Sequence, residues 1–240
     1  MVSELDKTMN TGTAAFSPEK PVGHNQDAYS RAVWIIPLWI LLTAGLFFVD
    51  SLTVREASTI GVSGSWLRSL LTASIPVLTV WGFFILGGLV LVCTRRFWPL
   101  LAYVSTVTVT VGLLHLLKIV VGRARPSEDL GAFHFELFAG SAVEYDSFPS
   151  GHTTAAFLLA FLVSLYYPKF RPVIIVIALA GAVSRVIVGR HFPSDVVAGI
   201  GLAWFGVAMG RFYFGPHLFP RLLLAGTASD AKHGAHPKVS

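Results

Sequence analysis

The sequence has little cysteine and little charge. Cys93 is the only cysteine among 240 residues, which excludes an intrachain disulfide. Charged residues make up 13% of the chain and hydrophobic residues 54%, and the mean hydropathy is +0.67, which is too apolar for an ordinary soluble domain. The net charge of +5 is scattered between apolar segments, so we expect no nucleic-acid partner. The composition predicts an integral membrane protein.

Apolar segments long enough to cross or nearly cross a bilayer recur along the chain, and no internal repeat of 20 to 50 residues accompanies them. The sequence predicts an all-α bundle of six transmembrane helices, at about residues 32–49, 71–93, 98–117, 152–167, 172–188 and 195–214. The first run is expected to end at Asp50, followed by a loop to residue 70 with a short surface helix near Trp66. No cleavable leader pattern precedes this run, so it is expected to remain as an anchor. Residues 1–31 and 215–240 are expected to be flexible cytoplasmic tails flanking a 32–214 domain.

The positive-inside rule predicts the orientation of this bundle. An even number of spans places both termini on one side, and most basic residues at span ends share that side: Arg31, Arg95, Arg96, Lys169, Arg171, Arg211 and Arg221. We therefore expect that side to be cytoplasmic. The other side also carries basic residues, namely Arg68, Lys118, Arg123, Arg125, Arg185 and Arg190. Apart from Arg68, these exceptions lie in or beside the stretches that carry the predicted chemistry.

One stretch, Ser184-Arg-Val-Ile-Val-Gly-Arg-His191-Phe-Pro-Ser-Asp195, lies between the last two expected spans. Pro-Ser-Asp is a plausible first turn of a helix, which would let the Asp195 carboxylate turn back onto the His191 imidazole. Such a contact would fix the tautomer and leave the other ring nitrogen free to attack an electrophile. Arg185 suits bidentate binding of phosphate oxygens. The stretch predicts a nucleophile beside an anion site.

Two other stretches reach the same face of the predicted bundle. Lys118-Ile-Val-Val-Gly-Arg-Ala-Arg125-Pro126 would bring two cations, Lys118 and Arg125, to one anion. Pro149-Ser150-Gly151-His152 would start a helix whose free N–H groups and dipole favour phosphate. Each stretch alone has a simple structural explanation, as an interfacial anchor or an ordinary helix start. Their occurrence together on one face favours a functional site.

The predicted roles follow from the chemistry of these side chains. The phosphoryl oxygens would be held by Lys118, Arg125, Ser150, Gly151 and Arg185. His191 would attack phosphorus with help from Asp195, and His152 would protonate the leaving group and then activate water. Because fixed cations supply the charge neutralisation and no metal-site spacing occurs, we expect no metal and no cofactor.

These stretches resemble the three motifs of the type 2 phosphatidic acid phosphatase family, Lys-x6-Arg-Pro, Pro-Ser-Gly-His and Ser-Arg-x5-His-x3-Asp, over residues 115 to 200. Every prescribed residue is present at the right spacing. The resemblance to the membrane branch implies a helical bundle, a metal-independent reaction through phosphohistidine and an active site at the extracytoplasmic surface of a bacterial inner membrane. It implies that the functional positions are Lys118, Arg125, Ser150, Gly151, His152, Arg185, His191 and Asp195.

The expected substrate is a phosphorylated lipid whose tail stays in the bilayer. The resemblance suggests phosphatidylglycerol phosphate, undecaprenyl diphosphate, phosphatidic acid or lipid A 1-phosphate. Three alternatives remain: a lipid phosphotransferase, a haloperoxidase that would hold vanadate in the same pocket, and a non-enzymatic transporter or scaffold for anionic lipids. The haloperoxidases of the family are soluble, whereas this chain is mostly apolar span. The loop 127–148 is expected to shape the choice; its acidic residues, including Asp146, are interpreted as solvated loop charges. Its apolar residues would contact an acyl or isoprenoid chain or anchor the loop at the interface; they are Phe133, Phe135, Leu137 and Phe138.

Overall fold

The computed structural model describes residues 24–59, 79, 81–90, 92, 97–140 and 142–218. In these residues the chain forms helices, short turns and two isolated β-bridges, and no named strand occurs among them. The helices are α1 (His24–Thr59), α3 (Phe97–Val121), α4 (Gly151–Tyr166), α5 (Arg171–Ile187) and α6 (Pro193–Leu218), with a further apolar helix at Trp81–Val90. The contacts of the bundle and the site all lie within the unit Trp39–Ser240.

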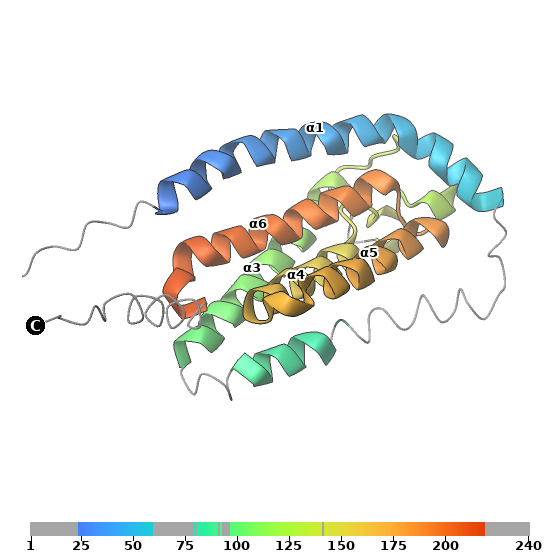
Figure 1. The fold of residues 1–240 in the computed structure, drawn as a ribbon. Coiled ribbons are helices and arrows are strands. Elements are labelled where there is room, and N and C mark those ends of the chain that lie inside the picture. The colour runs from blue at the N-terminus through green and yellow to red at the C-terminus, as the bar shows by residue number, and fades with distance from the viewer. Residues whose placement is uncertain are drawn as a thin grey trace, which may run out of the picture. The chain divides into compact units, whose positions relative to one another are not determined.

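Helices α3 to α6 pack side by side, with α6 against both α3 and α4, and α4 against α5 (Figure 1). Small residues allow the close approach of α3 and α6. A Cβ atom added at Gly206 or Gly210 would overlap the hydroxyl oxygens of Thr110 and Thr106, whose own protons are donated within α3. Larger residues at these two glycines would therefore push α6 away from α3.

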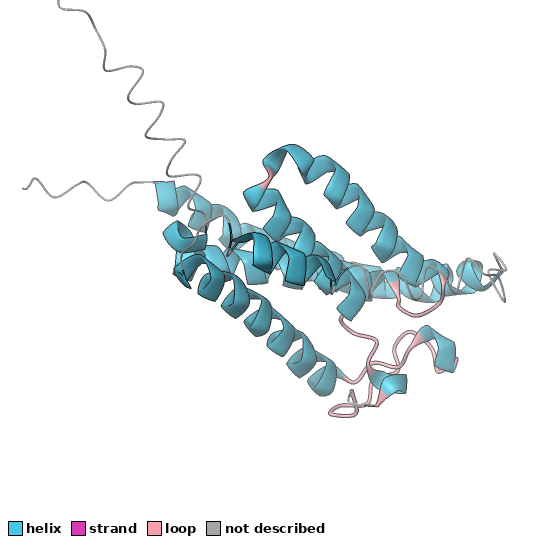
Figure 2. Ribbon diagram, turned by 90° about the horizontal axis from the view of Figure 1, so that it is seen from below, coloured by secondary structure: helices cyan, strands magenta, loops and turns pink. Residues whose placement is uncertain are grey.

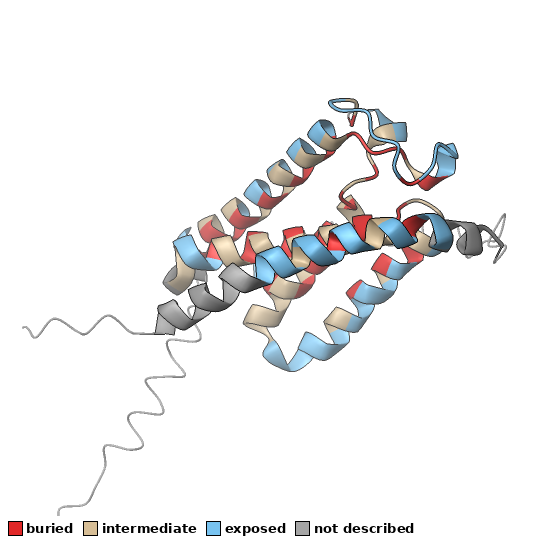
Figure 3. Ribbon diagram, turned by 90° about the horizontal axis from the view of Figure 1, so that it is seen from above, coloured by how far each residue is buried: buried red, intermediate tan, exposed pale blue. Residues whose placement is uncertain are grey.

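The outer surfaces of the long helices are apolar. Four described segments are long and apolar enough to cross a bilayer: Ile35–Leu52, Phe97–Val121, Pro168–Ile187 and Pro193–Gly215. Between 11% and 39% of each apolar window is buried, so most of these side chains face outward, as lipid-facing side chains do. Figure 3 shows the buried residues on the inward faces of the packed helices. These are the properties of integral membrane helices.

Two expected spans are represented by shorter helices. The Gly151–Tyr166 helix matches the expected fourth span but has 16 residues, fewer than the roughly 20 that a straight span needs. The Trp81–Val90 helix lies in the expected second span, much of which falls outside the described residues. The expected surface helix near Trp66, residues 1–23 and residues 219–240 also lie outside them. Among the described residues, four helices are thus long and apolar enough to cross a membrane, and two apolar helices are shorter.

The loop predicted to begin at Asp50 is wrong at its start. Helix α1 continues past Asp50 to Thr59, although its apolar window, Ile35–Leu52, overlaps most of the predicted span 32–49. The loop is predicted from Asp50 onward because Asp50, Arg55, Glu56 and Arg68 occur there among Gly and Ser. Instead the Asp50 side chain is fully buried and paired with the buried Arg123 guanidinium, so its charge is compensated and the helix can continue.

The long connection from Gly122 to Ser150 gathers at one end of the bundle (Figure 2). It starts with Gly122 at φ +53°, where a Cβ atom would overlap the Glu136 carbonyl oxygen, so glycine is required at this turn. Backbone hydrogen bonds then tie the segment to itself, including those from Arg125 N to Glu144 O at 2.9 Å and from Ser147 N to Arg123 O at 3.1 Å. The connection is therefore an ordered platform that carries charged side chains to the helix ends.

Candidate active site

The three predicted stretches meet at the end of the bundle that carries this connection. Lys118 lies in the last turn of α3, and a Cβ atom on Gly151, the first residue of α4, would lie 3.5 Å from its Cε. The ring centroids of His152, in the first turn of α4, and His191, between α5 and α6, are 6.5 Å apart. The predicted residues therefore come together from four helices.

Cations surround the two histidines. The positive charges of Arg185, Lys118 and Arg125 all act electrostatically on His152. Arg185 is buried in the last turn of α5, and its carbonyl oxygen accepts the backbone N–H groups of Arg190 and His191, at 3.0 and 3.3 Å. The end of α5 thus fixes both a cation and the start of the His191 loop. An anion at this place would meet three positive charges.

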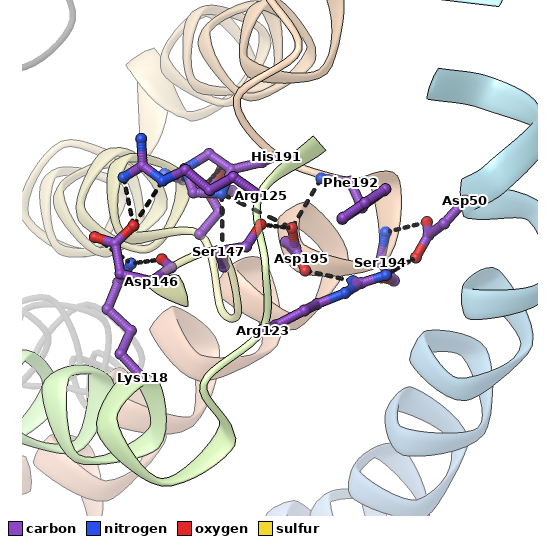
Figure 4. Close-up of polar contacts among 12 residues, drawn as sticks. Asp50, Lys118, Arg123, Arg125, Asp146, Ser147, His191, Phe192, Ser194 and Asp195 are labelled. Atoms are coloured by element: carbon purple, nitrogen blue, oxygen red, sulfur yellow. Dashed lines mark hydrogen bonds and ion pairs between the residues drawn. The ribbon is translucent and has the colours of Figure 1, made fainter. Parts of the chain in front are cut away.

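The His191 imidazole is held by a backbone carbonyl. Its Nδ1 atom lies 2.9 Å from the Ser147 carbonyl oxygen, whereas Asp195 Oδ2 is 3.8 Å away, beyond hydrogen-bond distance. Because a carbonyl oxygen can only accept, Nδ1 carries the proton and the lone pair is on Nε2. The predicted direct bond between Asp195 and His191 is therefore replaced by a contact with Ser147 (Figure 4).

Asp195 is engaged elsewhere, which explains this difference. Its Oδ2 atom accepts the Ser147 hydroxyl at 2.7 Å and the Phe192 backbone N–H at 2.8 Å. The second contact closes the first turn of α6, as an acidic residue at the third helical position does in a capping box. Asp195 thus supports His191 through Ser147, which contacts both residues.

The His191 side chain is 3% exposed, and this environment affects its protonation. Burial lowers the pKa of the imidazole below its ordinary value; Asp195 opposes this effect, and the charges of Lys118 and Arg125 add to it. A lowered pKa keeps the ring neutral to a more acidic pH. His191 is therefore a neutral, oriented nitrogen base at pH 7.

Ser150 caps helix α4. Its backbone N–H donates to the Asp195 carbonyl oxygen at 3.0 Å, and its hydroxyl oxygen accepts from Thr153 N at 3.5 Å and contacts Thr153 Oγ1 at 3.0 Å. The first N–H groups of a helix have no intrahelical acceptor, so those of Gly151 and His152 face outward from the helix start. The predicted helix start is present, with the Ser150 hydroxyl serving as the cap, and binding of an anion there stays a prediction.

Asp146 is not the solvated loop charge that the sequence suggested. Arg125 contacts its Oδ1 through Nε at 2.7 Å and through Nη2 at 2.5 Å. Lys118 Nζ contacts the Asp146 carbonyl oxygen and lies 3.4 Å from Oδ2. The interpretation was wrong because loop position alone does not reveal a facing cation. The carboxylate lies against two of the cations predicted to bind phosphate.

Sequence reasoning also missed the role of Arg123 and Asp50. Arg123 is fully buried and bonds to Asp195, Ser194 and Asp50 (Figure 4). A signal for Asp50 was present in the sequence. An acidic residue that follows the apolar run Leu46-Phe-Phe-Val49 needs a buried cation as its partner if the helix continues. Arg123 was a candidate for that cation because it lies within the same motif as Lys118 and Arg125.

A family model described as PAP2 superfamily matches residues 99–218, which include every residue of this site except Asp50. The chain belongs to the PAP2 superfamily. A solved PAP2-type phosphatidylglycerolphosphate phosphatase from Bacillus subtilis has the same fold, with a TM-score of 0.50 at 20% identity over 75% of this chain and 94% of that one.

Two curated relatives of this PAP2 protein act on lipid A according to their names. The lipid A 1-phosphatase of Rhizobium etli is 44% identical over 118 residues, which cover 47% of this chain and 50% of the relative. The lipid A 4'-phosphatase of Bacteroides thetaiotaomicron is 31% identical over 141 residues, covering 55% of this chain and 62% of the relative. The aligned part thus spans about half to three fifths of these relatives' length.

The position of Asp146 predicts the effect of its removal on anion binding. An anion approaching Lys118 and Arg125 must displace or face the Asp146 carboxylate, so Asp146→Asn should bind inorganic phosphate more tightly. A gain of roughly tenfold corresponds to about 1.4 kcal/mol, a modest value for a partly screened charge. Titration calorimetry on purified protein would measure it, with Glu144→Gln, an exposed neighbour, as the control. Weaker binding by Asp146→Asn would mean that the carboxylate organises the two cations.

Proposed function

We propose that the protein is a metal-independent phosphatase that removes phosphate from a membrane lipid through a phosphohistidine on His191. The observation that carries this proposal is the His191 ring, fixed through Nδ1 to Ser147 O with its Nε2 lone pair available, 6.5 Å from the ring of His152. Lys118, Arg125 and Arg185 supply the charge that stabilises an in-line phosphoryl transfer.

The proposed reaction has two steps. The negative charge of the bound phosphate opposes the positive charges around His152, so this ring takes up a proton when the substrate binds. His191 Nε2 then attacks phosphorus while the bond from phosphorus to the leaving oxygen breaks, and His152 donates its proton to that oxygen. In the second step His152 takes a proton from water, the water oxygen attacks phosphorus, and the P–N bond breaks to release inorganic phosphate. The Ser147 carbonyl oxygen keeps the Nδ1 proton in place and shares the positive charge that develops on the ring in the phosphohistidine.

A lipid substrate is supported by where the site lies. It is at the end of apolar helices, next to a loop with exposed Phe133, Phe135 and Phe138. The rings of Phe133 and Phe135 lie 6.4 and 5.9 Å from that of Phe47 on α1, so the aromatic loop surface continues onto an apolar span. The names of the Rhizobium and Bacteroides relatives make lipid A phosphate the first substrate to test. Phosphatidylglycerol phosphate, undecaprenyl diphosphate and phosphatidic acid are the other candidates.

We further propose a six-span topology in a bacterial inner membrane with both termini cytoplasmic. The basic residues at the opposite helix ends support it, since Lys169 and Arg171 flank the start of α5 and Arg211 lies near the end of α6. This orientation places the site at the extracytoplasmic surface, level with the headgroups of the outer leaflet.

Phosphate release from a substrate panel tests the function. Detergent-purified protein should release phosphate from at least one of the four lipids, faster than from water-soluble phosphate esters, and excess EDTA should not reduce the rate. Transfer of labelled phosphate to an acceptor hydroxyl instead of water would indicate a phosphotransferase. Lipid binding without any turnover would support a scaffold or transporter and contradict the proposal.

A further inference from the structure

Asp50 is a buried carboxylate on an otherwise outward-facing part of α1. Its side chain has no exposed surface, whereas its neighbours Val49 and Leu52 are 42% and 65% exposed. The carboxylate accepts the Ser194 backbone N–H at 3.0 Å and the Ser194 hydroxyl, and it pairs with Arg123 Nη2 at 2.8 Å. Asp50 thus joins the first span to the first turn of α6 at Ser194, the residue before Asp195.

Arg123 connects Asp50 to Asp195. Its Nη1 atom donates to Asp195 Oδ1 at 2.6 Å and to the Ser194 hydroxyl oxygen at 2.7 Å, and its Nε and Nη2 atoms both donate to the Ala132 carbonyl oxygen. The rings of Phe47 and Phe192 lie 4.3 and 4.0 Å from its Cζ. With its three nitrogens engaged and two rings against it, the guanidinium holds two carboxylates and cannot turn to bind phosphate.

The contacts form a continuous path to the reacting imidazole. Asp195 Oδ2 accepts the Ser147 hydroxyl, and the Ser147 carbonyl oxygen accepts the His191 Nδ1 proton. One cation shared by two buried carboxylates leaves a net negative charge beside Ser147 and His191. Without the Asp50 charge, Arg123 would neutralise Asp195 alone and would be free to move away from Ser194.

We propose that Asp50 is a positioning residue for phosphoryl transfer, which acts on His191 through Arg123 and Asp195 and so makes the first span part of the catalytic unit. This inference rests on the proposed function. The remaining negative charge stabilises the positive charge that develops on the ring when Nε2 bonds to phosphorus. The fixed first turn of α6 keeps His191 at the distance and angle that the attack requires.

The isosteric variant Asp50→Asn tests this role. Its kcat on the substrate identified by the panel should fall on the order of tenfold with KM little changed, since Asp50 does not touch substrate. Thr43→Val on the same helix is the matched control, because Thr43 is also buried and donates only to the Trp39 carbonyl oxygen among the contacts described. It should keep the wild-type kcat. Thermal unfolding of each purified variant separates lost stability from lost turnover.

A double-mutant cycle tests the path. If Asp50 acts through Asp195, Asp50→Asn should reduce kcat much less in an Asp195→Asn background than in the wild type. Independent, multiplicative losses would overturn the proposal, and so would an unchanged kcat in Asp50→Asn. Should Asp50→Asn fail to fold, Arg123→Lys, which keeps the charge but loses the fork geometry, serves in its place and should show the same kcat loss.

A second measurement does not depend on turnover. Nuclear magnetic resonance titration of ¹⁵N-histidine-labelled protein measures the pKa of His191 directly. The titratable and charged groups around this ring are Asp195 of α6, Lys118 of α3, His152 of α4 and Arg125 of the connecting loop. Asp50→Asn removes one of the two carboxylate charges that share Arg123, so Arg123 would neutralise more of the Asp195 charge and the pKa of His191 should fall. An equal His191 pKa in Asp50→Asn and the wild type would overturn the inference, even if the wild type hydrolyses lipid phosphate. A wild type inactive on the panel would instead contradict the proposed function, while the titration would still decide the coupling.

Discussion

His191→Ala is expected to abolish phosphate release, with a loss of at least about 10⁴-fold in kcat, as for the loss of a covalent nucleophile. The reason is that His191 Nε2 is the atom proposed to bond to phosphorus, and its lone pair is available because Nδ1 donates to the Ser147 carbonyl oxygen at 2.9 Å. Alanine removes both nitrogens. Initial rates of phosphate release from the preferred lipid at saturating concentration would measure the loss.

The control for this variant is His134→Ala. His134 is an exposed imidazole on the same loop platform, and its ring lies 6.0 Å from that of Tyr145 rather than beside His191. It should keep a near-native rate. A His191→Ala protein that binds the lipid, unfolds at the wild-type temperature and still turns over at a comparable rate would refute the nucleophile assignment.

His152→Ala is expected to lose about 10²- to 10⁴-fold in kcat on a lipid phosphate, the range usual for a general acid and base. The loss should depend on the leaving group. An alkoxide or sugar oxygen needs the proton from His152, whereas p-nitrophenolate leaves readily without one, so the first step with p-nitrophenyl phosphate should be much less affected. Single-turnover release of p-nitrophenol compared with release from the lipid measures this difference.

The second step gives an independent check on His152. Without a base to activate water, the phosphohistidine should accumulate, and p-nitrophenol should appear as a burst followed by slow turnover. Equal losses on both substrates with no burst would contradict the assignment, and would place His152 among the phosphate-binding groups.

The helix ends at the site were predictable because each carries a local signal. Ser150 before Gly151 marks the start of α4, Pro193 marks the start of α6, and Lys118 lies in the last turn of α3 as expected. Family membership was predictable for the same reason, since the three motifs are short and local. These features depend on neighbours in sequence, which a reader of the chain can see.

The missed contacts depend on partners distant in sequence. Asp50 and Arg123 are 73 residues apart. Taken alone, Asp50 resembles the end of a span and Arg123 resembles a ligand for an anion. Asp146 resembles a solvated loop acid until Arg125 is placed against it. The Ser147 carbonyl oxygen has no side-chain signature at all, so sequence reasoning gave the tautomer-fixing role to Asp195. Charge pairing inside a bundle decides these cases, and only the fold shows which pairs form.

The most direct test of the central claim is to trap the covalent intermediate. Protein mixed with lipid carrying ³²P in the scissile phosphate and quenched within one turnover should retain label that is acid-labile and base-stable, and peptide mapping should place it on His191. The label should be absent from His191→Ala and enriched in His152→Ala. Label on another residue, or turnover by wild-type protein with no labelled protein at any quench time, would contradict a phosphoryl transfer through His191.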